Sequence, residues 1–156
     1  MTESMGVPIL IADDSKDDIR LIERAFAEAK VFNPVDIVHD GQALLDHLEK
    51  AEPGGIPAIP GLILLDLNMP VLDGREALQA IRADPRLAPI PVLILSTSDL
   101  SDDVISSYRL GANAVLVKPF GYGEFVAMVE SIKRFWLERA CLPVLKGPPE
   151  GVDRRP

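Results

Sequence analysis

Five short runs rich in apolar residues, spaced at similar intervals along the chain, constrain its fold more than any other feature. They cover residues 7–12, 35–38, 62–65, 90–95 and 114–117. Apolar runs of this length are typical of strands buried on both faces of a parallel sheet. Apolar residues recur at helical spacing between and after these runs, within about 19–29, 43–48, 74–82, 102–110 and 123–139. This alternation predicts an α/β domain of right-handed βαβ units, with helices on both faces of a parallel sheet.

The length and composition of the chain indicate one packed domain. Its 156 residues, 47 % of them hydrophobic, are enough for a single sizeable core. We place the domain at residues 1–140. Residues 141–156 contain four prolines and are predicted to form a C-terminal tail.

The sequence also indicates where the protein works. No apolar run reaches the roughly 18 residues of a membrane span, and the N-terminus lacks the pattern of a secretory signal. The one cysteine, Cys141, cannot form an internal disulfide. We therefore expect a cytoplasmic protein that makes no membrane contact. A net charge of −8 argues against direct nucleic-acid binding, which needs a basic surface, and suits protein partners.

Polar residues that could carry chemistry stand at the ends of four predicted strands. The first strand ends in Asp13 and Asp14, the third in Asp66, the fourth in Ser96 and Thr97, and the fifth in Lys118. Sites in open parallel sheets form beyond the carboxyl ends of the strands, so these side chains are predicted to meet. A single strand-end aspartate is more often a turn former or a helix cap. The convergence of four strand ends on one edge favours a functional site.

The residue types at this edge favour magnesium and phosphoryl chemistry. Three carboxylates brought together repel each other unless a cation lies between them, and Mg²⁺ prefers oxygen ligands. Neither histidine lies near this edge in sequence, which argues against zinc. Lys118 can pair with the carboxylates or with a phosphoryl oxygen, and the Ser96 hydroxyl can donate to another such oxygen. An aspartate attacked by a phosphoryl donor forms an acyl phosphate, and these groups would neutralise the transferring oxygens.

Four motifs together resemble the receiver domains of two-component response regulators, over about residues 7–138. They are Asp13-Asp14, Leu-Asp66-Leu-Asn-Met-Pro-Val-Leu-Asp-Gly74, Ser96-Thr97 and Lys118-Pro119-Phe120. The resemblance implies a flavodoxin-like fold of three layers, in which a doubly wound, five-stranded parallel sheet has the strand order 2-1-3-4-5. It also implies a protein that is not an enzyme in the usual sense, because it catalyses only its own phosphorylation and dephosphorylation.

The resemblance assigns a role to each strand-end residue. Asp66 is the phosphoacceptor, Lys118 binds the phosphoryl group, and Thr97 contributes backbone of the phosphoryl-binding loop. Asp14, Asp66 and the backbone carbonyl of Asn68 bind Mg²⁺ directly, whereas Asp13 acts mainly through water. The peptide bond before Pro119 is expected to be cis.

The resemblance also implies partners. The phosphoryl donor would be a sensor histidine kinase. The segments Ile81–Pro85, Ile90–Val92 and Ser107–Asn113 resemble single-domain regulators that are paired with bacterial phytochromes, which makes a phytochrome the candidate kinase. Two positions depart from the common receiver pattern. Ser96 stands where many receivers have threonine and keeps the hydroxyl, whereas Val115 stands where many have an aromatic residue of the output switch.

Two other functions compete with this interpretation. An aspartate-based phosphohydrolase of the haloacid-dehalogenase type also uses a strand-end aspartate and Mg²⁺. It needs a cap and usually a second carboxylate two residues after the nucleophile, where this chain has Asn68. A degenerate receiver that acts without phosphorylation would normally have lost the acidic pair or the lysine, and this chain retains both.

The last predicted helix has more apolar residues than one buried face requires. Phe125, Met128, Val129 and Ile132 already supply a stripe of about 100°, so Val126, Leu137 and one aromatic residue are expected outside it. We therefore expect a homodimer formed through this helix. The alternative is that the tail folds back and covers the same surface.

Overall fold

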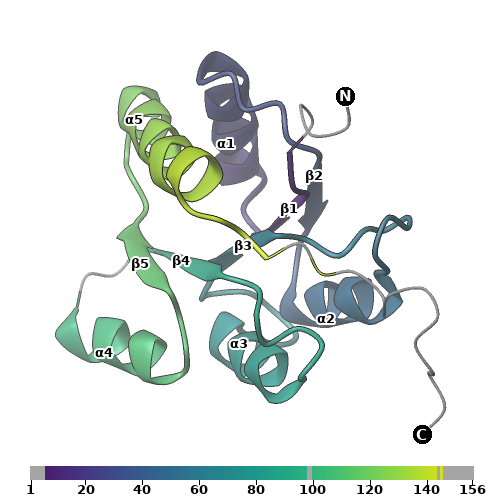
Figure 1. Ribbon diagram of the computed structural model, residues 1–156. Coiled ribbons are helices and arrows are strands. Elements are labelled where there is room, and N and C mark those ends of the chain that lie inside the picture. The colour runs from purple at the N-terminus through teal and green to yellow at the C-terminus, as the bar shows by residue number, and fades with distance from the viewer. Residues whose placement is uncertain (1–5, 98–99, 144, 146–156) are drawn as a thin grey trace, which may run out of the picture.

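The structure is a computed structural model that describes residues 6–97, 100–143 and 145, and it has three layers (Figure 1). The central sheet is parallel and has the strand order β2-β1-β3-β4-β5. Its strands are β1 (Ile9–Ala12), β2 (Val35–Val38), β3 (Leu62–Asp66), β4 (Val92–Ser96) and β5 (Ala114–Val117). The helices are α1 (Lys16–Glu28), α2 (Gly41–Lys50), α3 (Gly74–Ala83), α4 (Ser101–Arg109) and α5 (Tyr122–Ile132), followed by the π-helical segment η2 (Lys133–Arg139). The predicted fold class and strand order are confirmed.

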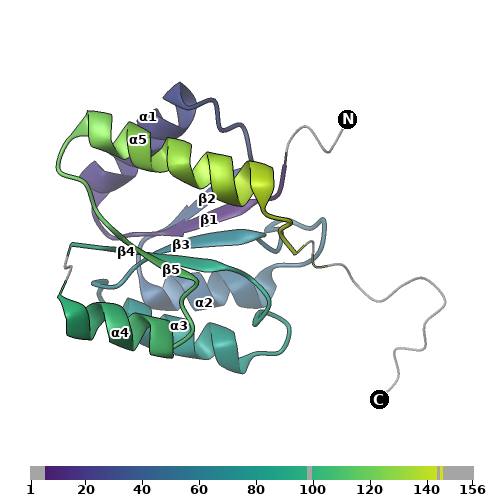
Figure 2. The ribbon, with the colours of Figure 1, turned by 60° about the vertical axis from the view of Figure 1, so that its left-hand side comes forward.

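The helices divide between the two faces of the sheet. Helices α1 and α5 lie side by side over one face, whereas α2, α3 and α4 lie on the other (Figure 2). None of the described helices is long and apolar enough to cross a lipid bilayer.

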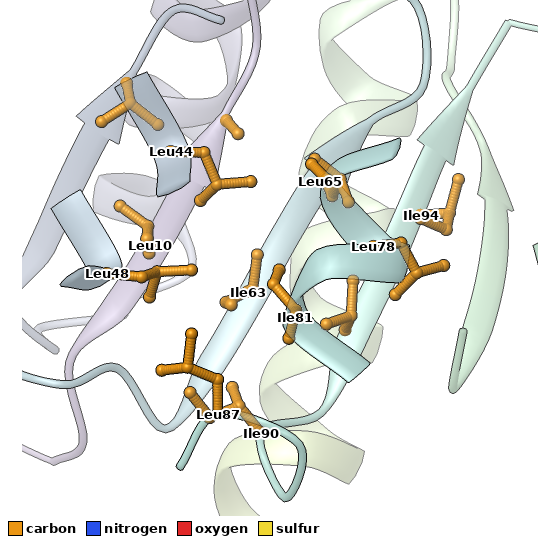
Figure 3. Packing of buried hydrophobic residues seen from close by; sticks show 14 of the residues in the cluster. Leu10, Leu44, Leu48, Ile63, Leu65, Leu78, Ile81, Leu87, Ile90 and Ile94 are labelled. Carbon is orange, nitrogen blue, oxygen red and sulfur yellow. The ribbon is translucent and has the colours of Figure 1, made fainter. Parts of the chain in front are cut away.

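Two hydrophobic cores sit on either side of the sheet, because successive strand residues point to opposite faces. Figure 3 shows the core under α2 and α3, where Ile63 and Leu65 of β3 meet Leu44, Leu78 and Ile81 of the helices. The alternate residues of the same strand join the core under α1 and α5. Burial of each such side chain stabilises the fold by roughly 1.5–3 kcal/mol. This packing fixes the ends of the strands, and with them the polar residues that follow.

Side-chain caps start three helices shortly after the strands end. The Ser15 hydroxyl accepts a hydrogen bond from the Asp18 N–H (3.2 Å), and Asp40 and Asp73 cap α2 and α3 in the same way. Ser15 is therefore the N-cap of α1, as its position in the sequence indicates. Because the connection from β1 to α1 is short, the first turn of α1 lies beside the carboxyl edge of the sheet.

Two strand boundaries differ from the prediction. Strands β1 and β4 begin at Ile9 and Val92, two residues later than the apolar runs indicate. A proline precedes each start, and proline has no N–H to donate to a neighbouring strand. The carbonyl groups of Pro8 and Pro91 still accept hydrogen bonds from Gly61 and Ile63, so these residues flank the sheet without belonging to it.

The last helix differs from the prediction more than the strands do. Val126, expected outside the buried stripe, is 7 % exposed and belongs to the core under α1 and α5. Of the two adjacent aromatic residues, one of which was expected outside the stripe, Phe135 is exposed, at 56 %. Beyond Ile132 the helix becomes π-helical, and the Ala140 N–H donates to the carbonyl of Phe135, five residues back. This wider turn changes which residues share a face, so a stripe drawn with 3.6-residue spacing fails there. Leu137 is half-buried against the core.

Candidate functional site

The sheet register brings the predicted site residues together at its carboxyl edge. Asp13 directly follows β1, and Asp66 ends β3, whose Leu65 lies opposite Ala12 of β1. Ser96 ends β4 and lies opposite Val117 of β5, and the backbone N–H of Lys118 donates to the Ser96 carbonyl (2.7 Å). All these residues therefore leave the sheet at nearly the same level.

Three carboxylates form a compact cluster at this edge. Asp13, Asp14 and Asp66 each offer one oxygen, and these oxygens lie within 4.8 Å of one another. Asp13 and Asp66 are almost fully buried, whereas Asp14 is exposed. Backbone N–H groups orient the buried pair: Ser15 donates to Asp13 Oδ1 (2.9 Å), and Asn68 donates to Asp66 Oδ1 (3.2 Å).

Lys118 brings one positive charge into the cluster. Its Nζ lies 2.8 Å from Asp13 Oδ2 and 3.5 Å from Asp66 Oδ2, and it donates a hydrogen bond to Asp18 Oδ2 at 2.9 Å. Burial by itself lowers the pKa of Lys118, but the hydrogen bonds and attraction of these carboxylates outweigh burial and raise the pKa above its usual value. The ammonium group is therefore charged at every physiological pH.

Burial has the opposite effect on the carboxyl group of Asp66. The pKa of Asp66 is raised from 3.8 to about 6, chiefly by loss of hydration and in smaller part by the neighbouring Asp13 charge. Lys118 and the Asn68 N–H oppose this rise by favouring the ionised form. Asp66 is thus a buried carboxylate that is ionised near neutral pH but incompletely compensated.

The donor set of the cluster fits a divalent cation. Asp13 Oδ2 is buried and has no aligned hydrogen-bond partner, although it lies close to the Lys118 ammonium. A buried oxygen of this kind can accept a cation. Oxygen-only ligands suit hard ions such as Mg²⁺ or Mn²⁺. No other group of three such ligand residues is present within residues 6–97, 100–143 and 145.

The remaining predicted residues lie around the cluster. Ser96 is 2 % exposed and Thr97 is exposed, and the two residues that follow lie outside the described part of the chain. Asn68 is exposed and orients Asp66 through its N–H. The hydroxyl and carbonyl roles of these residues stay predictions.

One expectation about the backbone is wrong. The Lys118–Pro119 peptide is trans, and the cis bond among the described residues precedes Pro57. The trans form is the usual one for X–Pro bonds, by about 0.5–1 kcal/mol.

Asp18 is the residue that the sequence did not reveal. It lies in the first turn of α1, and its side chain, 27 % exposed, bonds Lys118 across 100 positions of sequence. The signal was helical phase. Asp18 lies one turn before the buried Ile22 and therefore on the same face of α1, whereas the Asp17 side chain is 92 % exposed.

Comparisons with known proteins agree with this geometry. A family model described as the response regulator receiver domain matches residues 9–130. Response regulator Rcp1 from Synechocystis sp. is 41 % identical over 135 residues, which cover 86 % of this chain and 92 % of Rcp1.

Two solved structures are also similar. The phosphorylated cyanobacterial phytochrome response regulator RcpA has a TM-score of 0.81 and 40 % identity, over 88 % of this chain and 99 % of its own. The Mn²⁺-bound form of Rcp1 has a TM-score of 0.78, with the same identity and the same coverage. Receiver domains bind Mg²⁺ or Mn²⁺ at an acidic pocket and are phosphorylated by histidine kinases. This chain belongs to the response regulator receiver family, and it is a receiver-type signalling protein, not a classical enzyme.

Proposed function

We propose that the protein is a stand-alone response regulator that a sensor histidine kinase phosphorylates on Asp66 with the help of Mg²⁺. The observation that carries this proposal is the Asp66 carboxylate, almost fully buried, within an acidic cluster and 3.5 Å from the Lys118 ammonium. A buried carboxylate that only stabilised the fold would be better compensated by its neighbours.

The transfer forms one bond and breaks another. An oxygen of ionised Asp66 forms a bond to phosphorus, while the phosphorus–nitrogen bond to the kinase histidine breaks and its electron pair returns to the imidazole ring. Lys118 attracts the transferring oxygens, and the Ser96 hydroxyl donates to one of them. Asp13, Asp14, Asp66 and the Asn68 carbonyl would hold Mg²⁺, which neutralises charge on the phosphoryl oxygens when bound.

Phosphorylation would change the charge at the cluster and so alter binding to partners. The incoming phosphoryl group adds negative charge beside Lys118 and competes for the ammonium group with its present carboxylate partners. Val115, in place of an aromatic residue, implies an output that does not use an aromatic switch in β5.

The proposed kinase is a bacterial phytochrome. RcpA, a cyanobacterial phytochrome response regulator, matches this chain over nearly its own full length. We extend this pairing to the present protein because the segments at the end of α3, at the start of β4 and at the end of α4 resemble those of phytochrome-linked regulators.

The other predictions on organisation and location become part of this proposal. The receiver domain spans residues 1–140, and 141–156 form a tail whose Leu142 and Leu145 pack against the two cores. The protein acts in the cytoplasm and does not bind nucleic acid directly, as its single cysteine and charge of −8 indicate.

The proposed homodimer forms through the end of the last helix. Phe135 is exposed there and its ring stacks edge-on against Trp136, with the ring centroids 5.1 Å apart. Exposed aromatic side chains of this kind are enriched at interfaces.

Incubation with Mg²⁺ and acetyl phosphate tests the function. We expect each chain to take up one acid-labile phosphoryl group, and chelation of Mg²⁺ to prevent the uptake. Rapid continuous release of phosphate would indicate a phosphohydrolase. No uptake from acetyl phosphate or from the kinase would indicate a receiver that acts without phosphorylation.

A further inference from the structure

Lys118 is shared between carboxylates of different kinds. Its Nζ lies 2.9 Å from Asp18 Oδ2 but 3.5 Å from Asp66 Oδ2, so it is closer to the helix residue than to the phosphoacceptor. Asp13 Oδ2, at 2.8 Å, is the other near neighbour. Asp13 and Asp66 belong to the acidic cluster that can hold a cation, and Asp18 does not.

We propose that Asp18 is a positioning residue that competes with the phosphoryl group for Lys118 and thereby limits how much of the protein is phosphorylated. This inference rests on the proposed function of Asp66.

The argument begins with the cation. A divalent cation bound by Asp14 and Asp66, and by Asp13 through water, draws on the Asp13 and Asp66 carboxylates that now attract Lys118, and it repels the ammonium group. Asp18 lies outside the cluster and keeps its full attraction. In the cation-bound protein, Asp18 is therefore the principal counterion of Lys118.

After phosphorylation, two anions compete for Lys118: the phosphoryl group on Asp66 and the Asp18 carboxylate. A phosphoryl group on Asp66 carries several negative oxygens that need the Lys118 ammonium, while the Asp18 carboxylate holds it from α1. The two anions also repel each other across the lysine. Competition for Lys118 and repulsion between the anions both disfavour the phosphorylated state. Asp18 therefore lowers the phosphorylated fraction whichever of the two effects is larger.

The partial exposure of Asp18 allows Lys118 to leave it for the phosphoryl group. Its side chain is 27 % exposed, so water can solvate the carboxylate when Lys118 leaves it. Asp13 is fully buried and has no such alternative. Asp18 can thus release the lysine at modest cost.

Neutralising Asp18 tests the proposal. We expect Asp18→Asn, and likewise Asp18→Ser, to lower on the order of tenfold the acetyl phosphate concentration that phosphorylates half of the protein, which corresponds to about 1.4 kcal/mol. Beryllium fluoride, a mimic of the phosphoryl group, should bind these variants more tightly by a similar factor, as measured by calorimetry with Mg²⁺. General damage to the site cannot produce a gain in both measurements.

Matched variants identify the cause. Asp17→Asn removes the same charge one residue earlier, from a side chain that is 92 % exposed and lies 4.0 Å from Arg20, and it should behave as wild type. Asp18→Glu keeps the charge and should remain close to wild type. In a Lys118→Ala background, competition for the lysine is gone, so Asp18→Asn should keep only the smaller gain that comes from direct repulsion between the two anions.

The outcomes that overturn the proposal are distinct. Equal gains in Asp17→Asn and Asp18→Asn would reduce the effect to net charge. A loss in both Asp18 variants would mean that Asp18 holds Lys118 where the phosphoryl group needs it. A wild-type protein that takes up no phosphoryl group and binds no beryllium fluoride would contradict the proposed function itself.

Discussion

Replacement of Asp66 by asparagine should stabilise the cation-free protein at alkaline pH. In the folded protein the pKa of Asp66 is raised from 3.8 to about 6, chiefly by burial. The folded state therefore holds this proton more tightly than the unfolded state does. Below pH 3.8 the group is protonated in both states and costs nothing. As the pH rises toward 6, folding must take up a proton, so stability falls, and above pH 6 the full penalty applies.

The size of this penalty follows from the two pKa values. A difference of about two between the folded and unfolded pKa corresponds to about 3 kcal/mol. The amide of Asp66→Asn keeps the shape of the carboxyl group and carries no charge. We expect the variant to gain up to about 3 kcal/mol in the free energy of unfolding at pH 8, and almost nothing near pH 4.

Urea unfolding at several pH values with a chelator present measures this difference. Asp17→Asn, which removes an exposed carboxylate, serves as the control and should change stability by less than about 0.5 kcal/mol. Millimolar Mg²⁺ should stabilise wild type more than Asp66→Asn, because the ion binds only the folded state and relieves the same repulsion. A variant less stable than wild type at pH 8, or a difference that does not change with pH, would refute the reasoning.

Two further predictions concern the cation and the assembly. Calorimetry should show a larger loss of Mg²⁺ affinity for Asp14→Ala than for Asp13→Ala, since Asp14 is exposed to direct ligation and Asp13 already contacts Lys118; equal losses would contradict these different roles. Light scattering at micromolar concentration should give the mass of a dimer for the full chain and of a monomer for Phe135→Ser, whose exposed ring we place at the interface. A monomeric mass for the wild-type protein in both phosphorylation states would contradict the proposed homodimer.

The sequence determined the architecture and most of the site because both depend on local patterns. Apolar runs marked all five strands, and the residues after them had to meet once the strands were known to be parallel. A lysine that follows β5 and an aspartate that ends β3 therefore became neighbours by topology. Their approach to 3.5 Å depends on packing that no local pattern encodes.

The predictions that failed depended on information beyond the local pattern. Strand starts moved by two residues because Pro8 and Pro91 cannot donate to the sheet. Val126 lies in the regular helix α5 and is buried by packing that the pattern did not show, whereas the position of Leu137 depends on the π-helical segment, which an average helical period cannot supply. Asp18 was missed because its contact with Lys118 joins two elements that adjoin only in the folded sheet.

The most direct test of the central claim is to locate the phosphoryl group. Wild type and Asp66→Asn should be treated with a phosphoryl donor and Mg²⁺, and their intact masses and peptide maps compared, with circular dichroism to show that both are folded. We predict that wild type gains the mass of one phosphoryl group on the peptide that contains Asp66, and that the variant gains none. A variant that is labelled at the wild-type rate, or a label that maps to another residue, would contradict the assignment of Asp66 as the phosphoacceptor.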